Sequence, residues 1–476
     1  MTTVLAIDQG TSGTKAIVVD AAGTVLSTAE VGLRPRHLDG GAVEQDPQAL
    51  LDSVVVAGRR ALEESGVPVD AVALANQGES VLAWDPDTGR PLTPVIVWQD
   101  RRAEPWCRRH AGQRDRVHAL TGLELDPYFS APKMRWLRDT LTTEGVVTTT
   151  DTWLVHRLCG AFVTDASTAS RSLLLDLDAL AWSPELLALF GLEAERMPRV
   201  VANDEVVGET SVFGPTLPVA GLVVDQQAAL LAQACLEPGT AKCTFGTGAF
   251  VLAQTGTDAV RSASGLTSSV AWRIGSRTSY CLDGQVYTAA SAVRWAVDAG
   301  LLESAEGLDA GAAPSSEGVL FVPGFAGLAA PWWDPTATAT ISGLRLGTGS
   351  RHVVRALVEG IACQVAELTA LVGDDVGTPL TRLRVDGGLT RSTTLMQAQA
   401  DLSQVPVEVY PSAHATPLGA AACARLALEP GADLAAVVGG WVPERTYEPT
   451  WSADRARTHL AGWHQLAQVV LAQANP

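Results

Sequence analysis

The segment from Asp8 to Lys15 combines residue types that bind a phosphate and a metal ion, and it follows a short apolar stretch that predicts a buried strand. Its sequence is Asp8-Gln9-Gly10-Thr11-Ser12-Gly13-Thr14-Lys15. The glycines let backbone N–H groups approach an anion, the hydroxyls add donors, and Lys15 adds a positive charge for a phosphate. Asp8, at the end of the strand, is placed to hold a metal ion or its water ligands. Taken alone, the segment is explained better by an ordinary polar β-hairpin, because short glycine-rich motifs are weak evidence.

A second glycine-threonine turn repeats this pattern roughly half a chain later. Residues 240–252 predict a strand, a turn at Gly246-Thr247-Gly248 and a returning strand. A unit repeated at this separation predicts duplicated α/β domains that face one cleft. The repeat therefore strengthens the phosphate-binding interpretation of the first turn.

Polar side chains also follow three other predicted strands. They are the turn 76–80 with Glu79, the turn 98–102 that begins with Trp98, and the exit of strand 219–224 at Asp225. Ligands bind at the carboxyl ends of strands in open α/β sheets, so we expect these residues near one site. Each of the first two turns, taken singly, is also compatible with a plain surface turn.

Composition excludes several classes of function. The chain has 476 residues, which is enough for two full hydrophobic cores, and its formal net charge of −18 argues against nucleic acid or an anionic membrane as a partner. The most apolar stretch, residues 217–235, contains Asp225, so we expect no membrane insertion. The seven cysteines have no C-x-x-C spacing, and the chain enters a strand without a signal segment, so we expect reduced thiols and a cytoplasmic location. A homodimer or higher homo-oligomer stays open.

The elements around the turns predict two domains, residues 1–236 and 237–476. A helix from about Pro47 to Glu64 begins after Asp46, which is a good N-cap. A later helix of small residues contains Gly419, and its amino end is suited to face a nucleotide.

The two turns, with Asp225-Gln226-Gln227 between them, resemble the FGGY family of carbohydrate kinases in the actin-like ATPase superfamily, and within that family the glycerol kinases. The resemblance runs from Asp8 to the helix of Gly419, in the family's order. It implies an α/β fold of two duplicated actin-like ATPase (ribonuclease H-like) domains around a central cleft. The implied activity is ATP-dependent phosphorylation of a hydroxyl of a small polyol or sugar, with ATP and Mg²⁺ as cofactors.

The resemblance also assigns residues, position by position. The nucleotide positions are Thr11, Ser12, Gly13, Lys15, Thr247 and Gly419. The substrate positions are Glu79, Trp98, Tyr128, Asp225, Gln226 and Phe250. Asp225 falls on the family's general base, and Asp8 remains the candidate ligand for Mg²⁺.

Three departures from the glycerol kinase pattern bear on the substrate. Gly78 stands where those enzymes have an arginine, and Val224 stands where they usually have a glycine. Ala290 and Arg294 occupy positions where those enzymes have a glycine and a glutamine, respectively. Loss of a cation that binds two hydroxyls favours a longer polyol or a ketose over glycerol. We therefore expect the Gly78→Arg change to raise activity on glycerol, and a ketose kinase such as xylulokinase or ribulokinase stays open.

Two other classes of protein share the phosphate-binding turns. An actin-like ATPase without a small substrate would not need the turn at Trp98 or an acid at Glu79. A sugar-binding regulator on an inactive kinase fold would not need both Asp8 and Asp225. The kinase interpretation accounts for all four residues.

Overall fold

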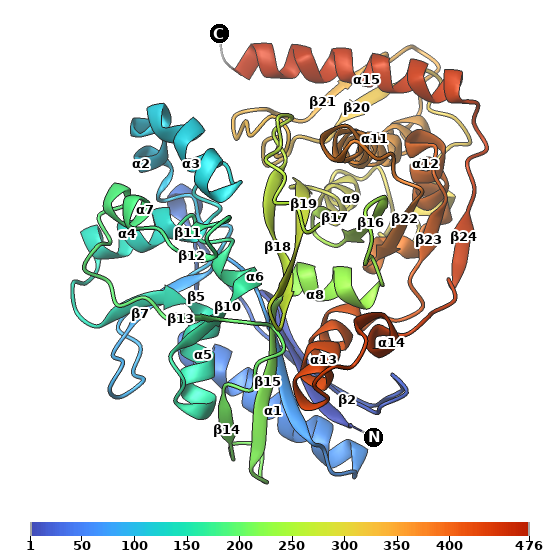
Figure 1. Cartoon of the computed structure of the whole chain (residues 1–476). Helices are drawn as coiled ribbons and strands as arrows, with labels where there is room; N and C mark the ends of the chain where they lie inside the picture. The colour runs from blue at the N-terminus through green and yellow to red at the C-terminus, as the bar shows by residue number, and fades with distance from the viewer. Residues whose placement is uncertain (1, 475–476) are drawn as a thin grey trace.

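A computed structural model describes residues 2–474 and contains two large sheets with related topologies (Figure 1). The first has the order β14-β15-β6-β1-β2-β3. Its strands are β1 (Val4–Gln9), β2 (Gly13–Val19), β3 (Val25–Gly32), β6 (Ala71–Asn76), β14 (Gly208–Thr210) and β15 (Leu217–Val224). The Asp8–Lys15 segment joins β1 to β2 at the centre of this sheet, as predicted.

The second sheet has the order β18-β19-β17-β16-β22-β23-β24. Its strands are β16 (Thr240–Phe245), β17 (Ala249–Gly256), β18 (Thr267–Ile274), β19 (Arg277–Val286), β22 (Arg382–Asp386), β23 (Val407–Val409) and β24 (Arg445–Tyr447). From β3 to β14, neighbouring strands of the first sheet pair antiparallel, antiparallel, parallel, parallel and antiparallel. The second sheet repeats this series from β19 to β24. The predicted duplication of an α/β unit is therefore confirmed.

A third, smaller sheet adds a lobe to the first half that the sequence did not predict. Its order is β4-β5-β8-β7-β9, with strands Arg36–Leu38, Ala42–Gln45, Val95–Ile96, Val81–Trp84 and Val146–Thr149 in that order. Helix α4 (Ser130–Thr140) packs on β7, and Trp98 and Tyr128 lie in the loops that leave β8 and enter α4. This lobe therefore carries two of the predicted substrate residues.

Helices pack on both large sheets and, in the first half, also around the smaller sheet (Figure 1). In the first half they are α1 (Pro47–Ser65), α2 (Glu104–Arg109), α3 (Arg114–Thr121), α5 (Thr150–Cys159), α6 (Ala166–Ala169), α7 (Pro184–Leu189) and α8 (Asp225–Ala232). Later come α9 (Ala290–Asp298), α10 (Leu308–Gly311), α11 (Ser350–Val376), α12 (Thr393–Ser403), α13 (Ala415–Leu428), α14 (Leu434–Val438) and α15 (Ala453–Ala474). Short strands complete the fold: β10 (Val163–Asp165), β11 (Leu175–Asp176), β12 (Ala181–Trp182), β13 (Arg199–Val201), β20 (Leu320–Val322) and β21 (Thr340–Ser342).

Two of these helices illustrate how the sequence forms them. Asp46 caps α1 as predicted, because its side chain accepts hydrogen bonds from the backbone N–H groups of Gln48 and Ala49. Helix α11 is long and apolar enough to cross a membrane by composition, but 78% of its most apolar window is buried inside the fold. Its apolar side chains belong to the core of the second half, together with β17, β19 and β20.

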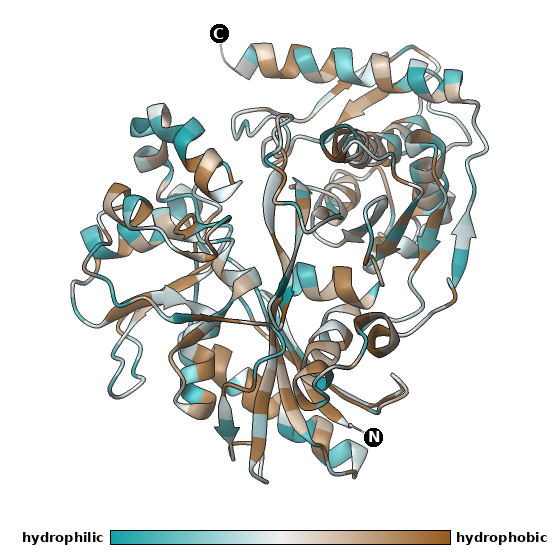
Figure 2. Cartoon of the chain, viewed as in Figure 1, coloured by the Kyte–Doolittle hydropathy of each residue, from teal (hydrophilic) through white to brown (hydrophobic). Residues whose placement is uncertain are grey.

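Helix α13 comes late in the chain but packs on the first sheet. It contacts β15, β1, β6 and α8, and its residues share a core cluster with Val4 and Ala6 of β1. A side chain at Gly419 would collide with the carbonyl of Ala228 in α8, so glycine permits this close approach. Figure 2 shows the hydrophobic colouring of α13 beside the strands of the first sheet. The division into residues 1–236 and 237–476 stays a prediction, and α13 is the segment that crosses it.

Candidate active site

Two carboxylates lie at the carboxyl edge of the first sheet. The parallel strands β1, β6 and β15 are in register there, with Asp8 opposite Ala75 and Val224 opposite Asn76. Asp225 directly follows Val224 and begins α8. Burial, and then the negative charge of Asp8, raise the pKa of Asp225 to about 7, and burial raises the pKa of Asp8 to about 6. The site therefore holds an acid whose pKa is suited to accept a proton near neutral pH.

The first turn is held in place by side chains from the smaller sheet and from β6. The Thr11 hydroxyl donates to Gln77 Oε1 at 2.9 Å and accepts from Trp98 Nε1 at 2.9 Å. Gln45 Nε2 donates to the Thr11 carbonyl at 2.6 Å, and Gln77 Nε2 donates to Gln45 Oε1 at 2.8 Å. Because the Thr11 hydroxyl already has two partners, its side chain contributes to the shape of the turn. Ser12 is exposed.

Lys15 lies at the border between the first turn and the late helix α13. Its Nζ is 3.1 Å from Glu30 Oε1 and donates to the carbonyl of Ala413 at 3.3 Å. Ala413 lies just before α13, so the amino end of the helix that contains Gly419 is beside the first turn. Gly419 itself is buried against α8. The predicted roles of Lys15, Gly13 and Gly419 toward a nucleotide stay predictions.

The second turn docks onto the beginning of α9. The carbonyl of Thr247 accepts hydrogen bonds from the backbone N–H groups of Ala289 at 2.8 Å and Ser291 at 3.2 Å. The Thr247 residue is exposed, as is Arg294 on the same helix. The structure thus places both residues at the surface, and the backbone N–H of Ala290 donates to the Gly246 carbonyl at 3.0 Å.

Three aromatic rings from separate elements meet next to Glu79. The Trp98 ring lies edge-on to Tyr128, with centroids 5.6 Å apart, and edge-on to Phe250 of β17, with centroids 6.2 Å apart. Glu79 has a positive φ of 58°, an uncommon backbone conformation for a residue other than glycine that often marks a functional site. The structure therefore brings together the predicted substrate residues from both halves of the chain.

Arg171 is a residue of this group that the sequence did not identify. Its Nε donates to Glu79 Oε1 at 2.6 Å and its Nη1 donates to Asp283 Oδ1 at 2.7 Å. Arg102, which follows the Trp98 turn, pairs with Asp100 and Glu44 and makes no ion pair with Glu79. The only sequence signal for Arg171 is a lone charge in the small and apolar run 166–175, and the partners lie 92 and 112 residues away.

Lys242 is a second residue that sequence reasoning missed. It is fully buried on β16 and its Nζ donates to Gln226 Oε1 and, at 2.9 Å, to Thr244 Oγ1. Thr244 Oγ1 in turn donates to Asp386 Oδ1 at 2.6 Å. Because the lysine engages the amide oxygen of Gln226, the amide nitrogen of Gln226 remains available as a donor.

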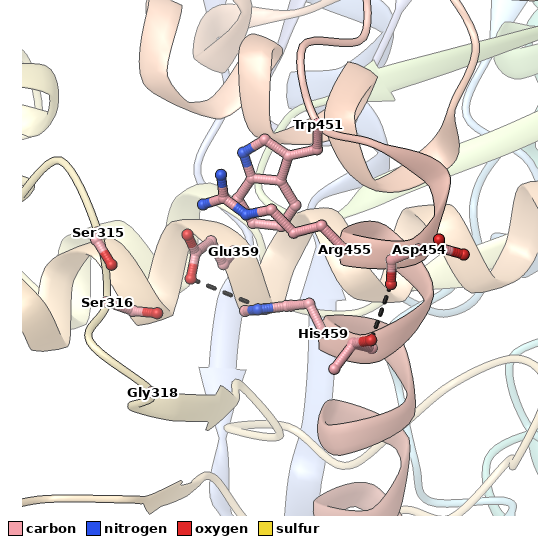
Figure 3. A pocket seen from close by; sticks show the side chains of 9 residues that line it. Ser315, Ser316, Gly318, Glu359, Trp451, Asp454, Arg455 and His459 are labelled. Atoms are coloured by element: carbon pink, nitrogen blue, oxygen red, sulfur yellow. Dashed lines mark hydrogen bonds and ion pairs between the residues drawn. The ribbon is translucent and has the colours of Figure 1, made fainter.

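A cavity of about 400 Å³ lies elsewhere, between the loop at Ser315, α11 and α15 (Figure 3). Glu359 and His459 face each other across it, with Oε2 and Nε2 3.8 Å apart, and the Arg455 guanidinium lies 3.8 Å from the Trp451 ring centroid. None of the predicted site residues lines this cavity. It is therefore separate from the candidate active site.

Comparisons with known proteins identify the family of the chain. The model of the FGGY family of carbohydrate kinases, N-terminal domain, matches residues 3–232, and that of the C-terminal domain matches residues 241–428. The glycerol kinase of Aromatoleum aromaticum is 41% identical over 98% of this chain and 98% of its own, and that of Trichlorobacter lovleyi is 40% identical over 100% of both.

Solved structures show the same fold. Glycerol kinase from Plasmodium falciparum with ADP matches with a TM-score of 0.91 and 30% identity, over 99% of this chain and 98% of that one. Gluconate kinase from Lactobacillus acidophilus has a TM-score of 0.90 at 21% identity, over 100% and 98% of the two chains, and supports the fold alone. Both halves of the sequence and the whole structure match, and the chain belongs to the FGGY family of carbohydrate kinases.

Proposed function

We propose that this kinase transfers the γ-phosphoryl group of ATP to a hydroxyl of a small, glycerol-like polyol. The observation that carries the proposal is the position of Asp225, a half-buried acid whose pKa is raised to about 7 by burial and by the nearby charges of Asp8 and Glu79. The glycerol kinases that resemble the chain over nearly their full length support a polyol as the acceptor. The structure of the Plasmodium falciparum enzyme with ADP supports an adenine nucleotide as the donor.

Asp225 is proposed as the general base that takes the proton of the attacking hydroxyl. General-base catalysis typically contributes about 10²- to 10⁴-fold to a rate, and phosphoryl transfer otherwise depends on positioning and charge. Glu79 and the amide nitrogen of Gln226 would hold the substrate hydroxyls, and Trp98, Tyr128 and Phe250 would pack against its carbon chain. Ser12, Lys15 and Thr247 would contact the nucleotide phosphates.

The acidic residues fit a magnesium ion. Mg²⁺ is usually held by one or two carboxylates together with water and substrate phosphates. Asp8 and Asp225 provide two nearby carboxylates whose charges repel each other, and a cation between them would relieve that repulsion. Asp8 would therefore hold Mg²⁺, and the ion would neutralise charge on the phosphates.

The size of the substrate is part of this proposal. Gly78 removes one cation from the turn at Glu79, and the Arg171 guanidinium is engaged by the carboxylates of Glu79 and Asp283 instead of taking its place. The glycerol kinases that the chain resembles support a polyol of glycerol's size or somewhat larger. A ketose kinase is the second candidate, because Gly78 and Val224 both differ from the residues that glycerol kinases have at these positions.

A panel assay tests the proposal directly. ATP consumption and product formation are measured with glycerol, erythritol, threitol, xylulose, ribulose and gluconate, and without any acceptor. We expect turnover that depends on the acceptor and is fastest with a polyol of three or four carbons. Fastest turnover with a ketose would favour the second candidate. ATP hydrolysis that no acceptor stimulates would contradict both.

A further inference from the structure

Arg171 joins three parts of the molecule that are far apart in the sequence. It lies in the turn after α6, and its guanidinium contacts Glu79 of the first half and Asp283 on β19 of the second. The side chains of the three residues are almost fully buried, with exposed fractions of 6%, 6% and 5% for Arg171, Glu79 and Asp283. The Tyr128 ring centroid lies 5.8 Å from the guanidinium carbon. A planar guanidinium that is buried and donates to two carboxylates fixes the orientation of both of them.

The two carboxylates differ in what remains available to a ligand. Asp283 Oδ1 also accepts from Thr267 Oγ1 at 2.5 Å, and its Oδ2 accepts from Gln285 Nε2 at 2.5 Å. Both oxygens of Asp283 are therefore occupied by the protein. Glu79 uses only Oε1 toward Arg171, and its Oε2 has no partner among the residues that the structure describes. Oε2 of Glu79 is thus free to accept a hydrogen bond from a ligand, whereas each oxygen of Asp283 already accepts from the protein.

A side chain at position 78 would crowd Val224. A Cβ atom added to Gly78 would lie 3.0 Å from Cγ2 of Val224, which is closer than ordinary side-chain contacts. A longer side chain at position 78 would therefore have to displace Val224 or the turn. The guanidinium at Glu79 instead comes from Arg171, which belongs to another part of the first half.

We propose that Arg171 is a positioning residue for polyol binding, and that Asp283 of the second half holds it in place. Arg171 orients Glu79 so that Oε2 accepts from a substrate hydroxyl. The proposal rests on the proposed function, because Glu79 binds a polyol only if the chain phosphorylates one. It assigns a role in polyol affinity to Asp283, a residue of the opposite half that does not contact the substrate.

Steady-state kinetics of four variants test the proposal: Arg171→Gln, Arg171→Lys, Asp283→Asn and the double variant Arg171→Gln/Asp283→Asn. The polyol is the best substrate of the panel. We expect Arg171→Gln to raise the KM for the polyol roughly 10- to 150-fold, the scale of one lost charge-assisted hydrogen bond, with the KM for ATP and the kcat little changed. Arg171→Lys keeps the charge without the fork and should fall between the wild type and Arg171→Gln.

The control is Arg138→Gln, which breaks another buried pair of the first half. Arg138 contacts Glu195, and both side chains have an exposed fraction of 11%. This variant should lower the melting temperature but leave the KM for the polyol unchanged. A general loss of stability is thereby separated from a loss of polyol binding.

The double variant shows whether Asp283 acts through Arg171. Asp283→Asn keeps the shape of the side chain and the pair of Arg171 with Glu79, so it should fold even if Arg171→Gln does not. We expect it to raise the KM for the polyol, and we expect the double variant to match Arg171→Gln alone. The proposal would be overturned if the double variant multiplied the KM effects of the two single variants. It would also be overturned by an unchanged KM for the polyol in the variants that fold, or by an equal rise in the KM for ATP. A wild type that phosphorylates no polyol would overturn the proposed function instead.

Discussion

The two glycine-threonine turns occupy equivalent places in the two sheets but present different chemistry. In the first sheet Asp8, two residues before its glycine, pairs with Lys15 on the returning strand and with Ala75 on the parallel strand. This position therefore combines an acid, a cation and a small neutral neighbour.

In the second sheet the equivalent residue is Thr244. It pairs with Phe250 on the returning strand and with Asp386 on the parallel strand. The acid of this site is Asp386 on the neighbouring strand, and Thr244 donates a hydrogen bond to it. The position that corresponds to Lys15 is occupied by Phe250, whose ring contacts Trp98. Duplication thus preserved the strand pairing, but the candidate base and metal ligand both belong to the first half.

The largest expected effect comes from Asp225→Asn, because Asp225 of the first half is the proposed base. The amide keeps the shape but cannot take a proton, so we expect turnover to fall about 10²- to 10⁴-fold. Burial raises the pKa of Asp225 from 3.8 to about 7, so the folded protein binds the proton more tightly than the unfolded chain and ionisation at neutral pH opposes folding. The melting temperature of the variant should therefore rise. Near-normal turnover at saturating substrate would remove Asp225 from the role of base.

Paired substitutions of Asp8 and Asp386 compare the two halves directly. We expect Asp8→Asn to raise the Mg²⁺ concentration for half-maximal rate roughly 10- to 100-fold, because a metal ligand is lost. Asp386→Asn should change the Mg²⁺ requirement little, because Asp386 is engaged by Thr244. A titration of Mg²⁺ at fixed ATP distinguishes the two, and equal responses would contradict the difference between the halves.

The pH dependence of kcat/KM should also report the acids of the first half. Asp225 loses its function as a base when it is protonated, so activity should decline as the pH falls through about 7. Below that value the decline should approach about tenfold per pH unit. A pH series with the wild type measures it. An unchanged kcat/KM down to pH 5 would show that the base is another group or that its pKa is not raised.

The smallest expected effect concerns the difference at Gly78 and Val224. The expectation that Gly78→Arg alone raises activity on glycerol needs revision, because the new side chain would crowd Val224. We expect the single variant to lose activity, and Gly78→Arg/Val224→Gly to exceed it on glycerol roughly two- to tenfold, the scale of one hydrogen bond. Val224→Gly alone is the control. Equal activities of the single and double variants would mean that Val224 does not limit this site.

Local patterns predicted the parts of the site that depend on neighbouring residues. Both turns, the polar residues after β6 and β15, and the N-cap of α1 follow from short-range chemistry. The partners of Arg171 depend on long-range packing between the two halves, and periodicity carries no information about such contacts. The sequence predicted the strand before Trp98, which is β8 (Val95–Ile96), but not the smaller sheet that contains it. Other strands of that sheet, such as Arg36–Leu38, are too short to show an alternating pattern.

The placement of α13 bears on how the protein is made. The face of the first sheet that α13 covers is complete once β15 has been synthesised, but α13 begins only at Ala415. At elongation rates of about 5–20 residues per second, synthesis from β15 to the end of α13 takes about 10–40 s. During this time an apolar surface that includes Val4 and Ala6 is not yet covered by α13. The amino-terminal half therefore cannot complete its core during translation without the carboxyl-terminal half. Fragments that end near residue 236 should associate with other chains instead of remaining monomeric.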